Sequence, residues 1–364
     1  MKTTPKILII APSWIGDCVM AQPLLMLLKR QHPDAVIDVF APKWSLAVMK
    51  RMAQINDTIE NPFGHGDIKL FARYRVGRSL RAKNYTQAIV LPGSLKSALV
   101  PYFAKIPKRT GFVGENRYGL LNDIRPLDEL LLPKMVDRFA SLAFLSSDRI
   151  PQNVPNPHLT ADEISQQGCL KKFNLNTDKP VIAMCPGAEY GDAKRWRVRH
   201  FAETTKQCVA KGYQVWFFGS NKDADTAEQI VEQSGGLGVN LCGKTSLDEA
   251  VDLLALSSAV ICNDSGLMHI AAALNLPLIA IYGSSSPDHT PPLSHKAKIL
   301  SLNMSCSPCF ERTCPLGHTD CLEKLTPDLV MKALEELAVS SEQLAMSNEQ
   351  LFCFALRQNG LFLR

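Results

Sequence analysis

Two carboxylates stand where a predicted strand gives way to a predicted helix. Asp17 closes the segment P-S-W-I-G-D, directly after the apolar run Lys6–Ile10. Asp264 belongs to the segment N-D-S-G-L-M-H, directly after the apolar run Ala259–Cys262. A carboxylate at a helix start can cap the helix and complement its dipole, or act as a general base at the mouth of a cleft. For Asp17 the spacing leaves both interpretations open.

The residues that follow Asp264 are typical of a helix start that binds phosphate. Ser265 and Gly266 precede the apolar helical segment 267–274, so their backbone N–H groups are free to bind an anion. Gly266 lets a phosphate approach the backbone closely, and His269 lies one turn further on. A diphosphate would repel Asp264, so we expect this carboxylate to bind sugar hydroxyls or a cation. The alternative is a capping cluster with a hydrogen-bonded histidine.

A second glycine-bearing turn follows the predicted strand Val181–Cys185. Gly187 lies in this turn, and Lys194 follows in the segment G-D-A-K-R-W. A lysine at this place can offset charge on a leaving diphosphate, as a metal ion does elsewhere. The alternative is a solvated basic loop, which is less favoured because Lys194 and Gly266 both follow strand ends of the same half.

Two further patterns occur in metal sites, and we favour a structural interpretation for both. Asp223 and Asp225 form a D-x-D pattern, but acidic residues favour a helix N-terminus, so we expect them to open a helix over 223–233. Four cysteines have the spacing C-x2-C-x4-C-x6-C, which is close to a zinc pattern but lacks the second C-x2-C pair. They are Cys306, Cys309, Cys314 and Cys321. We expect reduced thiols in a compact loop, with structural zinc as the alternative.

Positive charge gathers in the first half of the chain. Residues 69–125 hold 12 basic residues and two acidic ones, although the net charge of the whole chain is only +5. This bias predicts an anionic partner such as nucleic acid, a phosphorylated substrate or a membrane surface; the alternative is a solvated face. On a helix, Arg75 and Arg78 would lie together while Arg73 points aside.

The composition is that of an ordinary globular protein of about two domains. Of 364 residues, 46% are hydrophobic and 21% are charged. The longest apolar runs are too short to span a bilayer, and the N-terminal residues lack the pattern of a secretory signal. Eleven cysteines in a chain without an export signal fit the reducing cytoplasm. We therefore expect a cytoplasmic protein.

Strand-like and helix-like segments alternate along the chain, which predicts parallel sheets with helices on both faces. The proline-rich stretch 146–157 interrupts this alternation. We therefore predict a first domain over 1–157, a second over 158–340 and a helical tail over 341–364. In doubly wound sheets, ligands bind beyond the carboxyl ends of the strands, so the cleft between the domains is the predicted site.

The motifs together resemble glycosyltransferase family 9, the bacterial lipopolysaccharide heptosyltransferases. The resemblance runs from about residue 6 to residue 338. It rests on A-P-S-W-I-G-D at 11–17, R-Y-G-L-L-N-D at 117–123, P-G-A at 186–188, D-S-G-L-M-H at 264–269 and the cysteine segment. The family implies a GT-B fold, in which two Rossmann-like doubly wound domains face each other across a cleft. The first would bind the acceptor and the second the nucleotide-sugar.

The resemblance also implies an activity. This is the inverting transfer of L-glycero-D-manno-heptose from ADP-heptose to the first heptose of the lipopolysaccharide inner core. Asp17 matches the catalytic base of the family. The residues implied for donor binding are Gly187, Lys194, Thr245, Asp264, Ser265, Gly266 and His269. Those implied for acceptor binding are Arg75, Arg78 and Arg117.

The same resemblance implies no cofactor, no divalent metal and no nucleic-acid partner. The protein would act on the cytoplasmic face of the inner membrane, in peripheral contact with it, on an acceptor made of Kdo-lipid A with one heptose. Two other classes remain open at this point. An epimerase or hydrolase would turn over the nucleotide-sugar without an acceptor, and a two-lobed binding protein would release it unchanged.

Overall fold

The computed structural model describes residues 4–64, 66–144 and 153–339, and it contains two parallel six-stranded sheets. The first sheet has the order β3-β2-β1-β4-β5-β6 and the second the order β12-β11-β10-β7-β8-β9. The strands of the first sheet are β1 (Lys6–Ile10), β2 (Val36–Pro42), β3 (Asp57–Asn61), β4 (Gln87–Val90), β5 (Lys108–Phe112) and β6 (Asp123–Arg125). Those of the second are β7 (Val181–Cys185), β8 (Gln214–Phe217), β9 (Val239–Asn240), β10 (Ala259–Asn263), β11 (Leu278–Ile281) and β12 (Ala297–Leu300).

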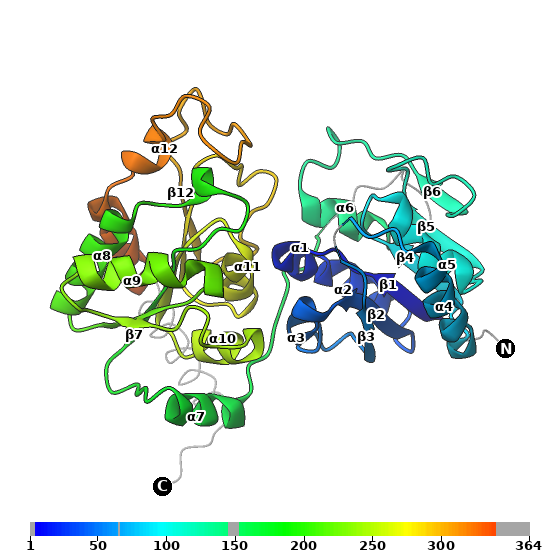
Figure 1. Cartoon of the computed structure of the whole chain (residues 1–364), viewed down its shortest axis with the longest axis horizontal. Helices are drawn as coiled ribbons and strands as arrows, with labels where there is room; N and C mark the ends of the chain where they lie inside the picture. Colours follow the sequence, from blue (N-terminus) through cyan, green and yellow to red (C-terminus); the bar gives the residue numbers. More distant parts are fainter. Residues whose placement is uncertain (1–3, 65, 145–152, 340–364) are drawn as a thin grey trace, which may run out of the picture.

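Helices connect the strands and cover both sheets (Figure 1). In the first half they are α1 (Ile15–Met20), α2 (Gln22–Gln31), α3 (Leu46–Met49), α4 (Leu70–Leu80), α5 (Leu99–Phe103) and α6 (Met135–Ser141). In the second half they are α7 (Glu163–Lys172), α8 (Val198–Ala210), α9 (Ala224–Gln233), α10 (Leu247–Leu254), α11 (Gly266–Ala273) and α12 (Asp320–Glu323). A further helix covers 327–339. No helix of the described chain is both long and apolar enough to cross a membrane.

The central strands are buried on both faces, as parallel sheets require. Every residue of β7 and of β10 is buried, and their apolar runs made both strands predictable. The edge strands β3 and β12 contain exposed residues and carry little pattern. Ala21 separates α1 from α2, and Pro23 lies in the first turn of α2, where its missing N–H costs nothing.

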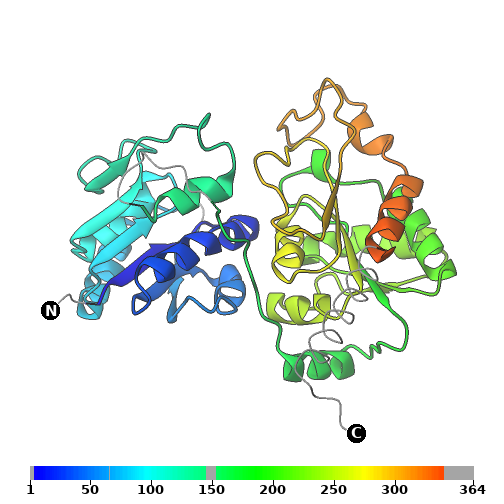
Figure 2. The same ribbon diagram turned by 180° about the vertical axis from the view of Figure 1, so that it is seen from behind.

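A crossing segment joins the two sheets, and its described part from residue 153 onward runs between the two halves to α7 (Figures 1 and 2). β1 to β6 precede this crossing and β7 to β12 follow it. Residues 145–152 of the predicted linker lie outside the described residues, as does the helical tail predicted over 341–364. The buried amide of Gln22 binds the crossing through both backbone groups of His158, at 2.7 and 2.8 Å.

One buried ion pair joins the halves next to this crossing. The Arg51 guanidinium, which follows α3, donates to both carboxylate oxygens of Asp252 in α10, at 2.6 and 2.8 Å. The Asp252 side chain is fully buried and also accepts the backbone N–H of Asp162 at 2.9 Å. Arg51 further donates to the carbonyl of Thr160 at 3.0 Å. The pair therefore joins α10, the crossing and the segment after α3 at one point.

Removing one partner of this pair is expected to destabilise the protein more than removing both. Arg51→Met leaves the Asp252 carboxylate buried and unpaired, which typically costs about 3–5 kcal/mol of unfolding free energy. The double variant Arg51→Met/Asp252→Leu removes that charge as well, so it should be more stable than the single variant. Urea unfolding followed by tryptophan fluorescence measures both. A single variant as stable as the double would contradict the assignment.

Candidate active site

The N-terminal turns of α1 and α11 meet between the two sheets. They pack so closely that neither Gly16 nor Gly266 has room for a β-carbon. A Cβ on Gly16 of α1 would lie 2.6 Å from Cδ2 of His269 in α11. A Cβ on Gly266 of α11 would lie 2.9 Å from Cβ of Ile15 in α1. Figure 1 shows the two helices facing each other from opposite halves. Since α1 follows β1 and α11 follows β10, this contact brings the carboxyl ends of the two sheets together.

Asp17 lies in the first turn of α1, at the place where the two helices meet. Burial raises the pKa of its carboxyl to about 6, against the opposing charges of His289 and Lys194. The nearby Asp264 carboxylate raises this pKa further. A carboxylate with a pKa near neutral is suited to take a proton from a hydroxyl group.

Lys194 and Asp264, predicted from two separate motifs, form an ion pair beside Asp17. The Lys194 ammonium lies 2.5 Å from Oδ2 of Asp264, and both side chains are largely buried. The pairing of Asp264 with a cation was one of the two options that the sequence left open. Burial lowers the pKa of His269 to about 4, so the imidazole packed on Gly16 is neutral at physiological pH.

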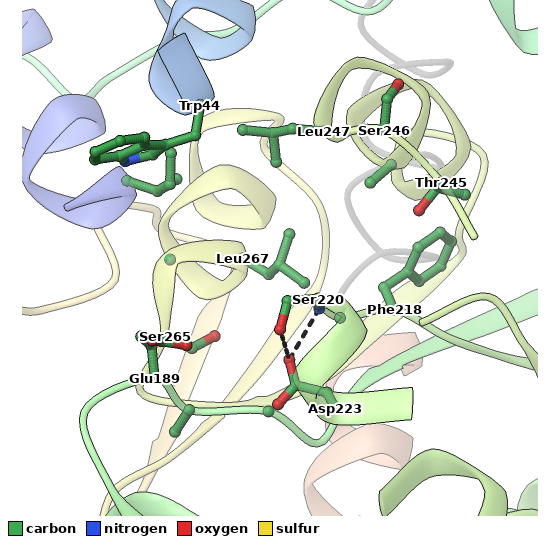
Figure 3. A pocket seen from close by; sticks show the side chains of 16 residues that line it. Trp44, Glu189, Phe218, Ser220, Asp223, Thr245, Ser246, Leu247, Ser265 and Leu267 are labelled. Atoms are coloured by element: carbon green, nitrogen blue, oxygen red, sulfur yellow. Dashed lines mark hydrogen bonds between the residues drawn. The ribbon is translucent and has the colours of Figure 1, made fainter. Parts of the chain in front are cut away.

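A pocket of about 290 Å³ opens next to this contact. Four predicted donor residues line it: Gly187, Thr245, Ser265 and Gly266. Figure 3 shows Trp44 at one end and Thr245 with Phe218 at the other. The walls combine apolar side chains from both halves, which suits a flat aromatic ring. Lys194, Asp264 and His269 do not line this pocket and lie on the Asp17 side of it.

Buried hydroxyl groups without a hydrogen-bond partner occur in the turns after β10 and β11 in the described part of the chain. The Ser265 hydroxyl at the N-cap of α11 is buried and has no hydrogen-bond partner among the described residues. The same holds for the hydroxyls of Ser284 and Ser285, in the loop after β11. An unpaired buried hydroxyl is costly, so a polar ligand that binds the Ser265 hydroxyl, in the pocket wall, would recover that cost.

His289 belongs to the same loop and is not marked by any motif in the sequence. Its Nδ1 lies 2.9 Å from the carbonyl oxygen of Pro133, in the other half of the chain. Its own carbonyl accepts the N–H of Met135 at 3.0 Å. These bonds bring the imidazole close enough to Asp17 to lower the pKa of that carboxyl. The only signal in the sequence is the position of the loop at the carboxyl end of a buried strand.

The structure corrects the expectation for Arg117. Its side chain is only 1% exposed, and all three guanidinium nitrogens donate within the domain. The acceptors include the carbonyls of Phe112 and Pro92 and the hydroxyl of Ser97. Burial lowers the pKa of this guanidinium to about 10. Arg117 therefore fixes the loops around β5 and is not free to bind an acceptor.

The other two predicted acceptor residues are exposed. Arg75 and Arg78 face solvent on α4, whereas Arg73 on the same helix is buried, so the predicted division of this helix is confirmed. Neither residue lines the pocket. Their role in acceptor binding stays a prediction.

The structure places the D-x-D pair and the four-cysteine segment, the two patterns that occur in metal sites, in different surroundings. Asp223 opens α9 as predicted, and its carboxylate accepts the N–H and the hydroxyl of Ser220 at 2.9 and 2.7 Å (Figure 3). The cysteines form a loop of free thiols; they are Cys306, Cys309, Cys314 and Cys321. Within the described part of the chain, no three His, Cys, Asp or Glu side chains are arranged to hold a metal ion.

The cysteine loop supports the turn that carries Lys194. The carbonyl of Arg312 accepts the N–H of Ala193 at 3.1 Å, and the carbonyl of Phe310 accepts the Tyr190 hydroxyl at 2.5 Å. The Tyr190 ring in turn lies 5.0 Å from the Lys194 ammonium. The loop is therefore part of the framework that positions this lysine.

Comparison with known proteins identifies the family. The model of glycosyltransferase family 9 (heptosyltransferase) matches residues 73–320. The chain belongs to glycosyltransferase family 9. It is 45% identical over 347 residues to lipopolysaccharide heptosyltransferase 2 of Escherichia coli K12, which covers 93% of this chain and 99% of that protein. It is 46% identical over 345 residues to lipooligosaccharide heptosyltransferase 2 of Haemophilus influenzae, covering 91% and 99%.

Solved structures agree with this assignment. The structure of E. coli ADP-heptose lps heptosyltransferase II superposes with a TM-score of 0.83 at 44% identity, covering 93% of this chain and 99% of that chain. A family 9 glycosyltransferase from Veillonella parvula superposes with a TM-score of 0.82 at 21% identity, with the same coverage, and supports the fold alone. The predicted GT-B fold of this family 9 glycosyltransferase is confirmed.

The raised pKa of Asp17 gives this glycosyltransferase a predicted pH dependence. The carboxyl must be ionised to accept a proton, so kcat/KM should fall as the pH drops below about 6. His289→Asn removes a neighbour whose charge lowers this pKa, so the acid limb of the profile should move to higher pH. His295→Asn, at an exposed position, is the matched control and should leave the limb in place. An unchanged limb in His289→Asn would contradict the placement of His289.

Proposed function

We propose that this glycosyltransferase transfers L-glycero-D-manno-heptose from ADP-heptose to the first heptose of the lipopolysaccharide inner core, with inversion at the anomeric carbon. The observation that carries the proposal is the position of Asp17, a carboxylate with a raised pKa, beside the Lys194–Asp264 pair. The names of the heptosyltransferase 2 relatives supply the sugar and the acceptor.

The donor would occupy the pocket and the N-terminus of α11. The adenine ring suits the apolar part of the pocket, between Trp44 and Thr245. The diphosphate would then lie at Ser265 and Gly266, where backbone N–H groups and an orphaned hydroxyl can bind it. Gly187 also lines this pocket. A side chain at this position would clash with the Asp223 carboxylate, so the position requires glycine.

The reaction needs one proton acceptor and one group that stabilises the leaving diphosphate. Asp17 takes the proton of the acceptor hydroxyl, whose oxygen forms a bond to the anomeric carbon of the donor. The bond between that carbon and the diphosphate oxygen breaks, and its electron pair leaves with ADP. Lys194 offsets the charge that develops on the diphosphate. Asp264 holds Lys194 in place and is itself available to a sugar hydroxyl.

The acceptor would approach from the first half of the chain. Arg75 and Arg78 remain available for its anionic groups because both face solvent. An acceptor anchored by lipid A places the enzyme at a membrane, and we propose the cytoplasmic face of the inner membrane. No cofactor and no divalent metal enter this scheme, since Lys194 and α11 supply the positive charge.

Asp17→Asn tests the scheme, because the amide cannot accept the proton. Transfer should fall by about 10²–10⁴, whereas ADP-heptose affinity measured by calorimetry should stay close to wild type. Burial destabilises the ionised carboxylate, so this variant should also melt at a higher temperature than wild type at pH 7. A variant that keeps its turnover while losing donor affinity would make Asp17 a donor contact instead of the base.

Turnover of ADP-heptose with and without a heptose-terminated core acceptor separates the classes of function. A glycosyltransferase releases ADP only when the acceptor is present and forms the lengthened core. Release of ADP or a changed sugar without acceptor would indicate a hydrolase or an epimerase. Binding without any turnover would indicate a binding protein.

A further inference from the structure

Large apolar side chains stand exposed next to each other where α4 begins. Ile68 is 65% exposed, Leu70 is 55% and Phe71 is 65%, and Leu95 in the loop after β4 is 40% exposed. Single exposed apolar residues are ordinary, but adjacent ones with a polar rim mark interaction sites. We propose that these four side chains, with Lys69 and Arg75, form a docking surface for a bilayer of anionic phospholipid.

The docking surface is built and held by a buried arginine. Arg73 is buried beneath it and donates to the carbonyls of Ile68 at 2.7 Å, Asp67 at 2.8 Å and Lys96 at 3.2 Å. Its guanidinium also lies 4.1 Å from the centre of the Phe63 ring. One cation thus joins the segment before α4 to the loop that carries Leu95. The apolar side chains are therefore held outward on a fixed backbone.

The charge around the apolar side chains is mainly positive. The Arg75 guanidinium lies 4.4 Å from the centre of the exposed Phe71 ring, and Arg78 is exposed one turn further along α4. Lys69 is exposed but is paired with Asp67 at 2.7 Å, an exchangeable surface pair of low strength. Apolar side chains next to arginine and lysine suit the boundary between acyl chains and anionic headgroups.

The position of the docking surface fits an acceptor held in the same bilayer. It follows β3 and β4 at the carboxyl edge of the first sheet, and Asp17 follows β1 at that same edge. None of the residues of this surface lines the donor pocket, so a bilayer bound there would not cover the residues of that pocket. The match between this surface and a membrane-held acceptor rests on the proposed function, whereas the binding of the surface to lipid does not.

Vesicle co-sedimentation with the full chain tests the proposal. Wild type should bind vesicles of phosphatidylethanolamine and phosphatidylglycerol, should bind phosphatidylcholine vesicles far more weakly, and should dissociate as salt rises. Leu70→Ser/Phe71→Ser should lower the affinity for the anionic vesicles by about tenfold or more. Leu130→Ser/Leu131→Ser is the matched control, since these two adjacent leucines of the same half are 93% and 56% exposed, and it should bind like wild type.

A second arm measures turnover with two forms of the acceptor. Leu70→Ser/Phe71→Ser should lose most activity on acceptor embedded in those vesicles and keep wild-type activity on a delipidated, water-soluble core acceptor. Loss of activity on both acceptors would overturn the proposal, because the surface would then bind the sugar itself. Undiminished vesicle binding, or equal loss in the Leu130/Leu131 control, would also overturn it. Wild-type activity on the delipidated acceptor reports on the proposed function independently of lipid binding.

Discussion

The candidate site depends on the contact between the first turns of α1 and α11, which pack too closely for a β-carbon at Gly16 or at Gly266. Gly16 of α1 lies against the ring of His269, and Gly266 of α11 lies against Ile15. Each helix follows an interior strand of its sheet, β1 or β10, so the contact fixes how the carboxyl edges of the two sheets face each other. Asp17, the proposed base in the first turn of α1, is thereby held beside the Lys194–Asp264 pair of the second half. The same contact places Ile15 in the wall of the pocket proposed to hold the donor.

Two other connections set the geometry around this contact. The buried Arg51–Asp252 pair joins the halves beside the crossing segment. On another side, the loop after β11 reaches the first half through the bonds of His289 to Pro133 and Met135. The Arg51–Asp252 pair is charged and buried, whereas the His289 bonds are exposed and easier to break. The Arg51–Asp252 contact is therefore expected to be the more persistent of the two connections.

The strands and the residues at their carboxyl ends are predictable from the sequence because they depend on the order of residues within short segments. The continuous apolar runs of β1 and β7 give both strands with the bounds that the structure has. Their carboxyl ends, with those of the neighbouring strands, then place Asp17, Lys194 and Asp264 at one cleft. The pairing of Lys194 with Asp264 follows from charge alone once the two turns are known to be neighbours.

The remaining features depend on burial and on contacts between distant segments. Arg117 has the charge expected of an acceptor contact, but nothing in its neighbourhood in the sequence shows that its guanidinium is buried. His289 reaches Asp17 only through a loop that binds the other half, so no motif marks it. Trp44, from the first half, lines a pocket formed mostly by the second half, and no motif marks this contact either. The exposed apolar side chains where α4 begins are held in place by the buried Arg73, whose burial no local pattern shows.

The most direct test of this account is the kinetic effect of a single methyl group at Gly16. A Cβ there meets the rigid ring of His269 at 2.6 Å, so Gly16→Ala should push α1 away from α11 and separate Asp17 from the bound donor. Single-turnover transfer should then fall by about tenfold or more, since small displacements of reacting groups are costly, while ADP affinity stays within about twofold because the second half provides most of the pocket. Gly168→Ala, with open space around the new Cβ, controls for the methyl group itself. Wild-type transfer rates in Gly16→Ala would contradict the claim that this contact positions the base.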